Sequence, residues 1–276
     1  MNQLISAVSP GEVTAPGLVD WLLARGIAGV STADIAHLLG VPVSQVRQRV
    51  ALLRKRNMLV SPARGFWVPV APEYRAGGAA EPFVYIDSMM HFLGQEYCVG
   101  WLTAAALRGA SHQAPQVFQV ATSGKSHNVQ VGSYRLDFVH RGFCGEVAAP
   151  ELTLRHGRAR VASPGTVALM VAGDLELTGG LDNAATVILE LSENKGFIAG
   201  VQDNAAFFSA AALRRLGWIL DTFSEDETIR SALSGLEKTA SAAGTSLSFL
   251  SPTDPRKGSV NRTWNLLINR EVEPDQ

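Results

Sequence analysis

The four-residue link Gly40-Val-Pro-Val separates two helix patterns and so limits how the N-terminal part of the chain can fold. Ser31 or Thr32 is placed to cap a helix over 33–39, and Gly40 stands where helices commonly end in the left-handed conformation. Ser44 begins the next helix pattern, which we expect to run over 44–56. A link this short is typical of a helix-turn-helix.

A further helix and a hairpin complete this unit. Apolar residues at helical spacing predict a helix over 16–25, before the link. Segments 59–60 and 66–68 are joined by a Pro-Ala-Arg-Gly turn, which predicts a hairpin with Arg64 at its tip. Three helices followed by a hairpin with a basic tip have the arrangement of a winged helix.

The helix after the link has two different faces. The arc that we expect to pack on the other helices holds Val46, Val50, Leu53 and Asn57, with Arg49 towards its edge. The opposite arc, flanked by Gln45 and Arg47, holds Ser44, Gln48, Ala51 and Lys55. Small, amide and cationic side chains suit a helix that lies in the major groove of DNA. We expect Gln48 to read a base edge and Lys55 to meet a phosphate.

The charge of this region is strongly biased. Residues 35–72 contain six Lys or Arg residues and neither Asp nor Glu, whereas the whole chain has a net charge of only -1. Basic runs are more often solvated faces than binding sites. Here the absence of acids, the short link and the hairpin occur together, and they favour binding to nucleic acid.

The chain predicts an α+β protein: an N-terminal winged helix-turn-helix domain at 1–72 and a larger mixed α/β domain at 82–276. A Gly- and Ala-rich segment, 73–81, separates them as a linker. The second domain opens with a helix at Pro82. It continues with a small-residue helix at 97–109, alternating strands at 116–121 and 134–139, a hairpin at 152–161 and several helices, including one over 203–216.

The sequence offers little catalytic chemistry. The histidines are scattered without metal-ligand spacing, and Ser111-His112 is better explained as a turn than as a nucleophile with its base. A nuclease would need Asp137 to converge with Glu190 and Lys195 on a metal, but those last two residues do not share a helix face. We therefore expect no enzyme, no metal and no cofactor, with the nuclease kept as a minor alternative.

Other features predict a cytoplasmic location. The two cysteines, Cys98 and Cys144, are too few for a disulfide framework and are expected to be reduced. The first residues lack the basic start of a signal peptide, and the longest apolar runs are too short to span a bilayer.

Two later segments resemble the AbiEi family of antitoxins. Tyr97-Cys-Val-Gly-Trp-Leu-Thr-Ala-Ala-Ala-Leu-Arg-Gly-Ala follows the family's pattern Tyr-x-x-Gly-x-x-x-Ala-Ala-x-x-x-Gly-Ala. Arg160-Val-Ala-Ser-Pro-Gly-Thr-Val-Ala-Leu is similar to a helix opening of the same family. With the N-terminal winged helix, the resemblance covers about residues 15–220.

The resemblance implies an antitoxin of a toxin–antitoxin system that acts in abortive infection, a phage defence. Such a protein represses its own operon at inverted repeats in double-stranded DNA. It also counters a nucleotidyltransferase-like toxin without a stable complex, and it is a monomer or weak dimer that pairs on DNA. The DNA-binding positions carried over are Ser44, Gln45, Arg47, Gln48, Arg54, Lys55 and Arg64. The rival hypothesis is a ligand-responsive transcriptional regulator, whose second domain would hold a deep, mostly apolar pocket.

Overall fold

The chain folds into two compact units in a computed structural model that describes residues 3–110, 116–154 and 157–275. Unit 1 comprises Met1–Tyr97, Gln116–Gly142 and Glu151–Arg160, and unit 2 comprises Cys98–Pro115, Phe143–Pro150 and Val161–Gln276. Each unit thus contains segments that are distant in sequence. The domain bounds 1–72, 73–81 and 82–276 stay a prediction.

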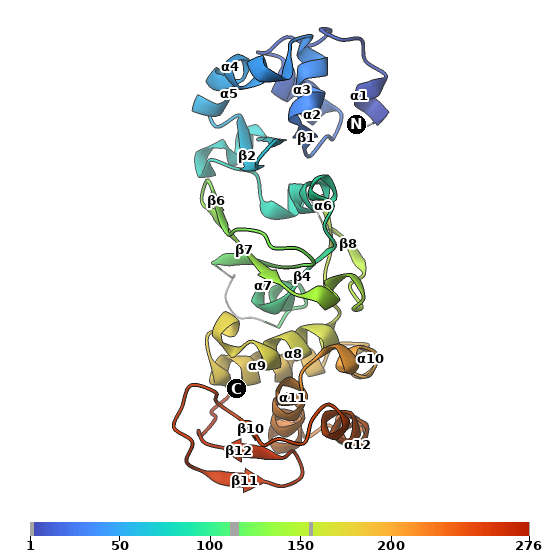
Figure 1. Ribbon diagram of the computed structural model, residues 1–276, viewed down its shortest axis with the longest axis vertical. Coiled ribbons are helices and arrows are strands. Elements are labelled where there is room, and N and C mark those ends of the chain that lie inside the picture. The colour runs from blue at the N-terminus through green and yellow to red at the C-terminus, as the bar shows by residue number, and fades with distance from the viewer. Residues whose placement is uncertain (1–2, 111–115, 155–156, 276) are drawn as a thin grey trace. The chain divides into compact units, whose positions relative to one another are not determined.

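Short helices and a small sheet form the N-terminal part of unit 1 (Figure 1). The helices are α1 (Gln3–Ser6), α2 (Leu18–Ala24), α3 (Thr32–Leu39), α4 (Val46–Arg49) and α5 (Ala51–Lys55), with the 3-10 turn η1 (Val43–Gln45) before α4. The antiparallel sheet has the order β1-β3-β2 and consists of β1 (Val30–Ser31), β2 (Leu59–Ala63) and β3 (Phe66–Pro69). This is the predicted order of three helical segments and a hairpin.

The helix expected over 44–56 is interrupted at Val50, where φ is -96° and ψ is 5°. Backbone hydrogen bonds cross the interruption, because Val50 N–H donates to Val46 O and Arg54 N–H to Val50 O, both at 3.0 Å. The expectation that Asn57 packs in the core is wrong. Asn57 is exposed and has a φ of 52°, because the helix has ended and asparagine tolerates the left-handed conformation.

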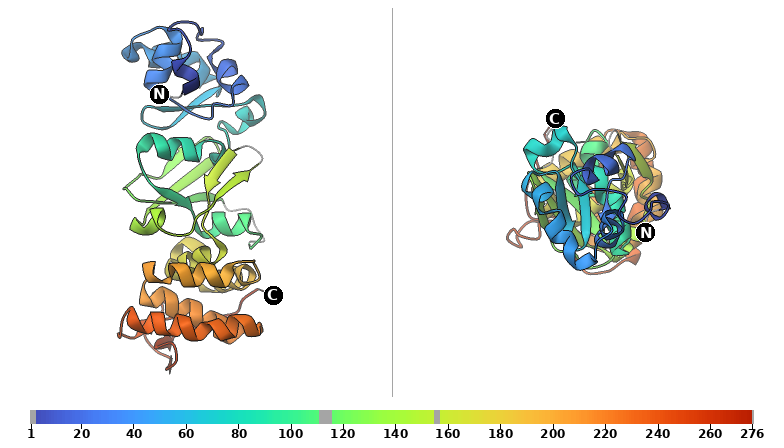
Figure 2. Two further views of the ribbon diagram at one scale, coloured as in Figure 1. Left: turned by 90° about the vertical axis from the view of Figure 1, so that its right-hand side faces the viewer. Right: turned by 90° about the horizontal axis from the view of Figure 1, so that it is seen from above.

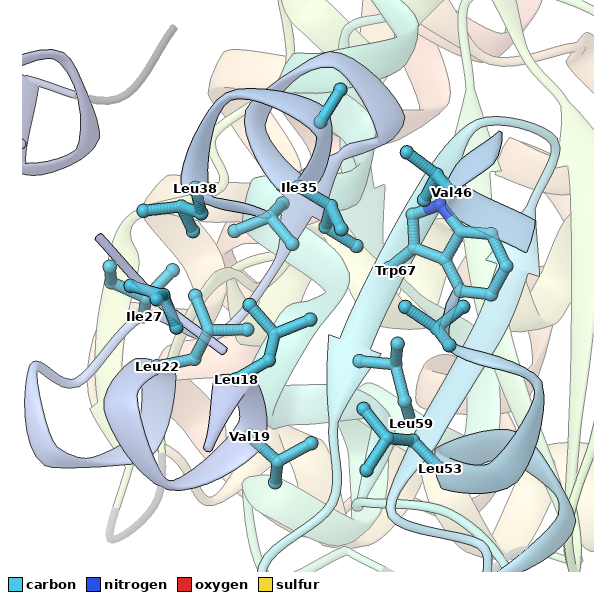
Figure 3. Packing of buried hydrophobic residues seen from close by; sticks show 14 of the residues in the cluster. Leu18, Val19, Leu22, Ile27, Ile35, Leu38, Val46, Leu53, Leu59 and Trp67 are labelled. Atoms are coloured by element: carbon cyan, nitrogen blue, oxygen red, sulfur yellow. The ribbon is translucent and has the colours of Figure 1, made fainter. Parts of the chain in front are cut away.

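One apolar core holds these helices on the sheet (Figure 3). Leu18 and Leu22 of α2 and Ile35 of α3 lie against Leu53 of α5 and Trp67 of β3, and each is at most 6% exposed. Burial of one such side chain contributes about 1.5–3 kcal/mol. The core therefore fixes which face of α4 and α5 remains in solvent.

The turn between α3 and η1 depends on glycine. Gly40 has a φ of 61°, and a Cβ at this position would lie 2.8 Å from Gly11 Cα. Both the left-handed backbone and the close approach exclude a larger residue. The N-cap of α3 is Ser31, which forms a capping box with Asp34, so both predicted ends of this helix are confirmed.

The remainder of unit 1 contains helix α6 (Pro82–Leu93), the 3-10 helix η2 (Pro72–Gly77) and three strands of a sheet whose fourth strand has only its first residue, Tyr97, in this unit. The sheet order is β4-β5-β7-β6, with β4 (Tyr97–Val99), β5 (Val117–Thr122), β6 (Val129–Val131) and β7 (Tyr134–His140). Strands β5 and β7 are parallel. A hairpin follows, formed by β8 (Glu151–Leu154) and β9 (Gly157–Arg160). In the expected linker, Ala79 and Ala80 are buried, and Ser133 N–H donates to Gly77 O at 2.8 Å.

Helix α8 (Pro164–Gly173) forms the centre of unit 2. Its residues from Pro164 to Ala172 are all buried, and it contacts four other helices: α7 (Trp101–Leu107), α9 (Leu181–Ser192), α10 (Phe197–Asn204) and α11 (Ala210–Phe223). Figure 2 shows these helices, coloured from green to orange, from two further directions. A helix that is apolar all round must be enclosed, which explains the absence of a polar face on α8.

Two expectations about elements need correction, and one strand was not predicted. The helix predicted from 97 begins only at Trp101, because Gly100 is extended and β4 precedes it. The helix predicted over 203–216 is two helices, because Ser209 accepts a hydrogen bond from Ala212 N–H and caps α11 as a new helix. Helix α12 (Glu227–Ala242) is followed by a sheet with β10 (Ser248–Phe249), β12 (Leu266–Ile268) and the unpredicted β11 (Ser259–Asn261).

Candidate nucleic-acid interface

The buried residues of η1, α4 and α5 decide which of their neighbours face solvent. Val46, Val50 and Leu53 are at most 6% exposed, whereas the polar positions around them are on the surface. All seven predicted DNA-binding residues are exposed: Ser44, Gln45, Arg47, Gln48, Arg54, Lys55 and Arg64. Arg49 is exposed as well, so its expected place at a packed edge is wrong.

Arg64 stands at the tip of the β2–β3 hairpin, as predicted. Ala63 pairs with Phe66, which leaves Arg64 and Gly65 as a two-residue turn, and Gly65 has a φ of 86°. Two-residue hairpin turns require left-handed conformations that glycine adopts at little cost. The Arg64 side chain is therefore held in solvent beside the helices.

Thr32, the first residue of α3, ties this hairpin to the helices. Its backbone N–H donates to Gly65 O at 2.8 Å, and its hydroxyl donates to the same oxygen at 3.2 Å. The same hydroxyl accepts a hydrogen bond of 2.8 Å from the indole Nε1 of Trp67. These contacts fix the distance between the hairpin and α3.

A groove of about 450 Å³ lies between the hairpin and the helix that begins at η1. Four predicted site residues line it: Ser44, Arg47, Arg54 and Arg64. Gln45, Gln48 and Lys55 are exposed but do not line this groove. The structure thus brings three arginines from a helix and a hairpin tip to one concave surface.

The three arginines, Arg47, Arg54 and Arg64, are not engaged in ion pairs in the part of the chain that the structure describes. The Arg54 guanidinium lies 5.7 Å from the centre of the Trp67 ring. This ring is uncharged, so the contact does not neutralise the positive charge of Arg54. The carboxylate of Asp34 is used to cap α3, because it accepts hydrogen bonds from the N–H and hydroxyl of Ser31 at 2.9 and 2.7 Å. The groove therefore presents positive charge, which attracts an anionic surface.

The residues considered for a nuclease are divided between the two units. Asp137 forms an ion pair of 2.9 Å with Arg135, and Glu190 lies in the other unit, on α9. No group of three His, Cys, Asp or Glu side chains among the described residues could hold a metal. Ser111 and His112 lie outside the described residues. Cys98 and Cys144 are buried and are not joined by a disulfide.

The described helices include none of the length and apolar character that crossing a bilayer requires.

Comparison with known proteins supports the resemblance noted in the sequence. Residues 98–221 match the model of the AbiEi antitoxin C-terminal domain. The fold is similar to the crystal structure of the RV2827C protein from Mycobacterium tuberculosis, with a TM-score of 0.63 and 13% sequence identity over 92% of this chain and 90% of that chain. At this identity the similarity shows the fold alone, and it agrees with the predicted α+β class. No curated protein matches the chain.

Proposed function

We propose that this chain, which carries an AbiEi antitoxin C-terminal domain over residues 98–221, is a DNA-binding antitoxin of a toxin–antitoxin system. It represses its own operon through the N-terminal winged helix and neutralises a nucleotidyltransferase-like toxin through the second domain. In this proposal the protein is not an enzyme, acts in the cytoplasm and serves in abortive infection of phage-infected cells.

The observation that carries the DNA-binding part is the groove with Arg47, Arg54 and Arg64. Three guanidinium groups without an ion-pair partner among the described residues converge from α4, α5 and the β2–β3 hairpin turn. Arginine is well suited to bind phosphate, because it presents a fixed fork of donors. A duplex backbone that followed the groove would bring its phosphates to all three side chains.

The remaining site residues have places in the same docking. With η1, α4 and α5 in the major groove, Gln45 and Gln48 reach base edges with their amide groups, while Lys55 meets the backbone. Arg64 at the hairpin tip meets the phosphate backbone beside the major groove. Recognition of inverted repeats requires two copies related by the symmetry of the DNA. A monomer or weak dimer that pairs on the operator satisfies this requirement.

The antitoxin part rests on the match of residues 98–221 to the antitoxin domain. That match includes strands of unit 1 and most helices of unit 2. A cut at residue 82 would leave part of unit 1 without the packing of its N-terminal segment. Point variants of the full chain therefore separate the two activities more cleanly than a fragment.

A mobility-shift titration on the DNA upstream of the gene tests the DNA-binding part. Arg47→Gln should weaken binding by roughly tenfold, since one charge-assisted contact is worth 1–3 kcal/mol. Arg49→Gln is the matched control, because Arg49 is exposed on the same helix but does not line the groove. Equal binding by wild type and Arg47→Gln would exclude the groove as the interface.

A ligand-responsive regulator is the second candidate function. One observation favours it: a groove of about 290 Å³ in unit 2, lined mostly by apolar residues of α10 and α12, with Gln202 and Thr239 among them. This is near the lower limit of small-molecule sites. An operon of metabolic genes around this gene would support the regulator, whereas an adjacent nucleotidyltransferase gene would support the antitoxin.

A further inference from the structure

Val43 is an exposed apolar residue at the start of the proposed recognition helix. It begins η1 and is 55% exposed. It lines the groove together with Ser44, Arg47 and Arg64, and no other exposed large apolar side chain of the described residues does so. Single exposed valines are common on protein surfaces, but this one stands among cations that attract DNA.

Folding does not account for the identity of this residue. The core of this region takes Val46 and Val50, both 0% exposed, and its partly buried margin includes Val41. Val43 belongs neither to that core nor to its margin. A polar residue at position 43 would cost the fold little apolar burial, so the use of the valine side chain has to be sought at the groove.

The major groove of DNA presents one apolar group, the C5 methyl of a pyrimidine. Thymine carries this methyl, as does 5-methylcytosine. The N-terminal residues of a recognition helix approach base edges most closely. Arginines beside Val43 would hold the phosphates, and the valine side chain would then cover a methyl at the edge of a base.

We infer that Val43 is a specificity-determining residue that reads the C5 methyl of a thymine in the operator. The inference rests on the proposed DNA binding and adds the group that is recognised. The contact supplies sequence preference without a hydrogen bond, because the methyl is absent from cytosine and uracil. Each thymine methyl covered should contribute about a fourfold preference, the value of one buried methylene-sized group.

The test compares two versions of the gene's own upstream DNA, one amplified with dTTP and the other with dUTP. They share sequence and phosphates but differ in the C5 methyl. Amplified DNA carries no methylated cytosine, so a difference between them assigns the contact to thymine. Wild type should bind the thymine DNA about fourfold more tightly for each contact, and Val43→Ala, whose side chain is shorter, should show a smaller preference.

Leu52→Ala is the matched control. Leu52 is 57% exposed on α5 but does not line the groove, so this variant should keep the wild-type ratio. Equal binding of both DNAs by wild type, or an unchanged ratio in Val43→Ala, would overturn the inference alone. Failure of wild type to bind either DNA would overturn the proposed function as well. Thermal melting checks that both variants fold.

Discussion

The indole Nε1 of Trp67 donates a 2.8 Å hydrogen bond to the hydroxyl of Thr32. Trp67 lies in β3 of the hairpin and is 3% exposed, while Thr32 opens α3. The hydroxyl in turn donates to Gly65 O, next to Arg64. One side chain thus sets the position of a cationic hairpin tip relative to the helices, and this position gives the groove its width.

Thr32→Val should destabilise the protein and weaken DNA binding. The substitution keeps the shape but leaves the buried indole N–H without an acceptor, at a cost of about 1–3 kcal/mol. Urea unfolding followed by circular dichroism measures this loss. Thr32→Ser keeps the hydroxyl, so it should lose clearly less stability than Thr32→Val. Equal stability of Thr32→Val and wild type would show that the bond does not hold the hairpin.

The salt dependence of DNA binding should distinguish phosphate contacts from base contacts. Arg47→Gln should lower the slope of log affinity against log salt by about 0.9, because one phosphate contact is lost. Gln48→Ala should weaken binding at every salt concentration without changing the slope. Titrations between about 50 and 200 mM salt are enough to measure these slopes. An unchanged slope for Arg47→Gln would remove Arg47 from the phosphate contacts.

Gly165→Ala should destabilise unit 2 and reduce neutralisation of the toxin. A Cβ at Gly165 would lie 2.3 Å from Phe197 O, so α10 would have to move away from α8. Overpacking of this kind costs about 1–3 kcal/mol. Gly173→Ala, on the same helix, is the control, since its Cβ would lie 3.5 Å from Ala212 Cβ, an ordinary contact. Thermal melting of both variants gives the comparison.

Two buried tyrosines of unit 1 should respond oppositely to loss of their hydroxyls. Tyr97 donates a 3.0 Å hydrogen bond to Asp87, and Arg160 N–H donates to the Tyr97 hydroxyl at 3.1 Å, so Tyr97→Phe should lower the free energy of unfolding. The Tyr85 hydroxyl is buried without a hydrogen-bond partner among the described residues. Tyr85→Phe should therefore leave stability unchanged or raise it by about 1 kcal/mol. Stability losses of equal size would contradict this difference.

Burial raises the pKa of both Tyr85 and Tyr97 well above the usual value for tyrosine. A raised folded-state pKa means that the unfolded chain loses its protons first. The contribution of these two tyrosines to the free energy of unfolding is then fully present below about pH 10 and is lost as the pH rises above it. Tyr85→Phe should make alkaline unfolding less steep, which a series of urea titrations between about pH 9 and pH 11 would measure.

Local features of the fold were predictable from the sequence, because they depend on neighbouring residues. The cap at Ser31, the left-handed Gly40 and the exposed Arg64 each follow from a residue's own conformational preference. The interruption at Val50 was not predictable, since apolar spacing continues through it. Nor does local sequence indicate that Trp101 adopts a φ of 45°, a conformation that its buried environment has to impose.

The site was predictable in composition but not in arrangement. Helical spacing identified Arg47 as a candidate, the predicted hairpin turn identified Arg64, and the family resemblance added Arg54. That these three line one groove, while Gln48 and Lys55 do not, depends on how the hairpin packs beside the helices. Such packing brings together positions distant in sequence. The sequence alone did not indicate a binding role for Val43, because an apolar residue before a helix usually belongs to the core.

The most direct measurement is survival of cells that produce the neighbouring gene's toxin from an independent promoter, so that its dose does not depend on repression. The protein is supplied as wild type or as Arg47→Gln/Arg64→Gln, and a reporter on the operon promoter is read in the same cells. We expect the double variant to release the reporter yet protect cells as well as wild type. Loss of protection together with repression, or a reporter that stays repressed, would contradict the assignment of DNA binding to the groove and neutralisation to the second domain.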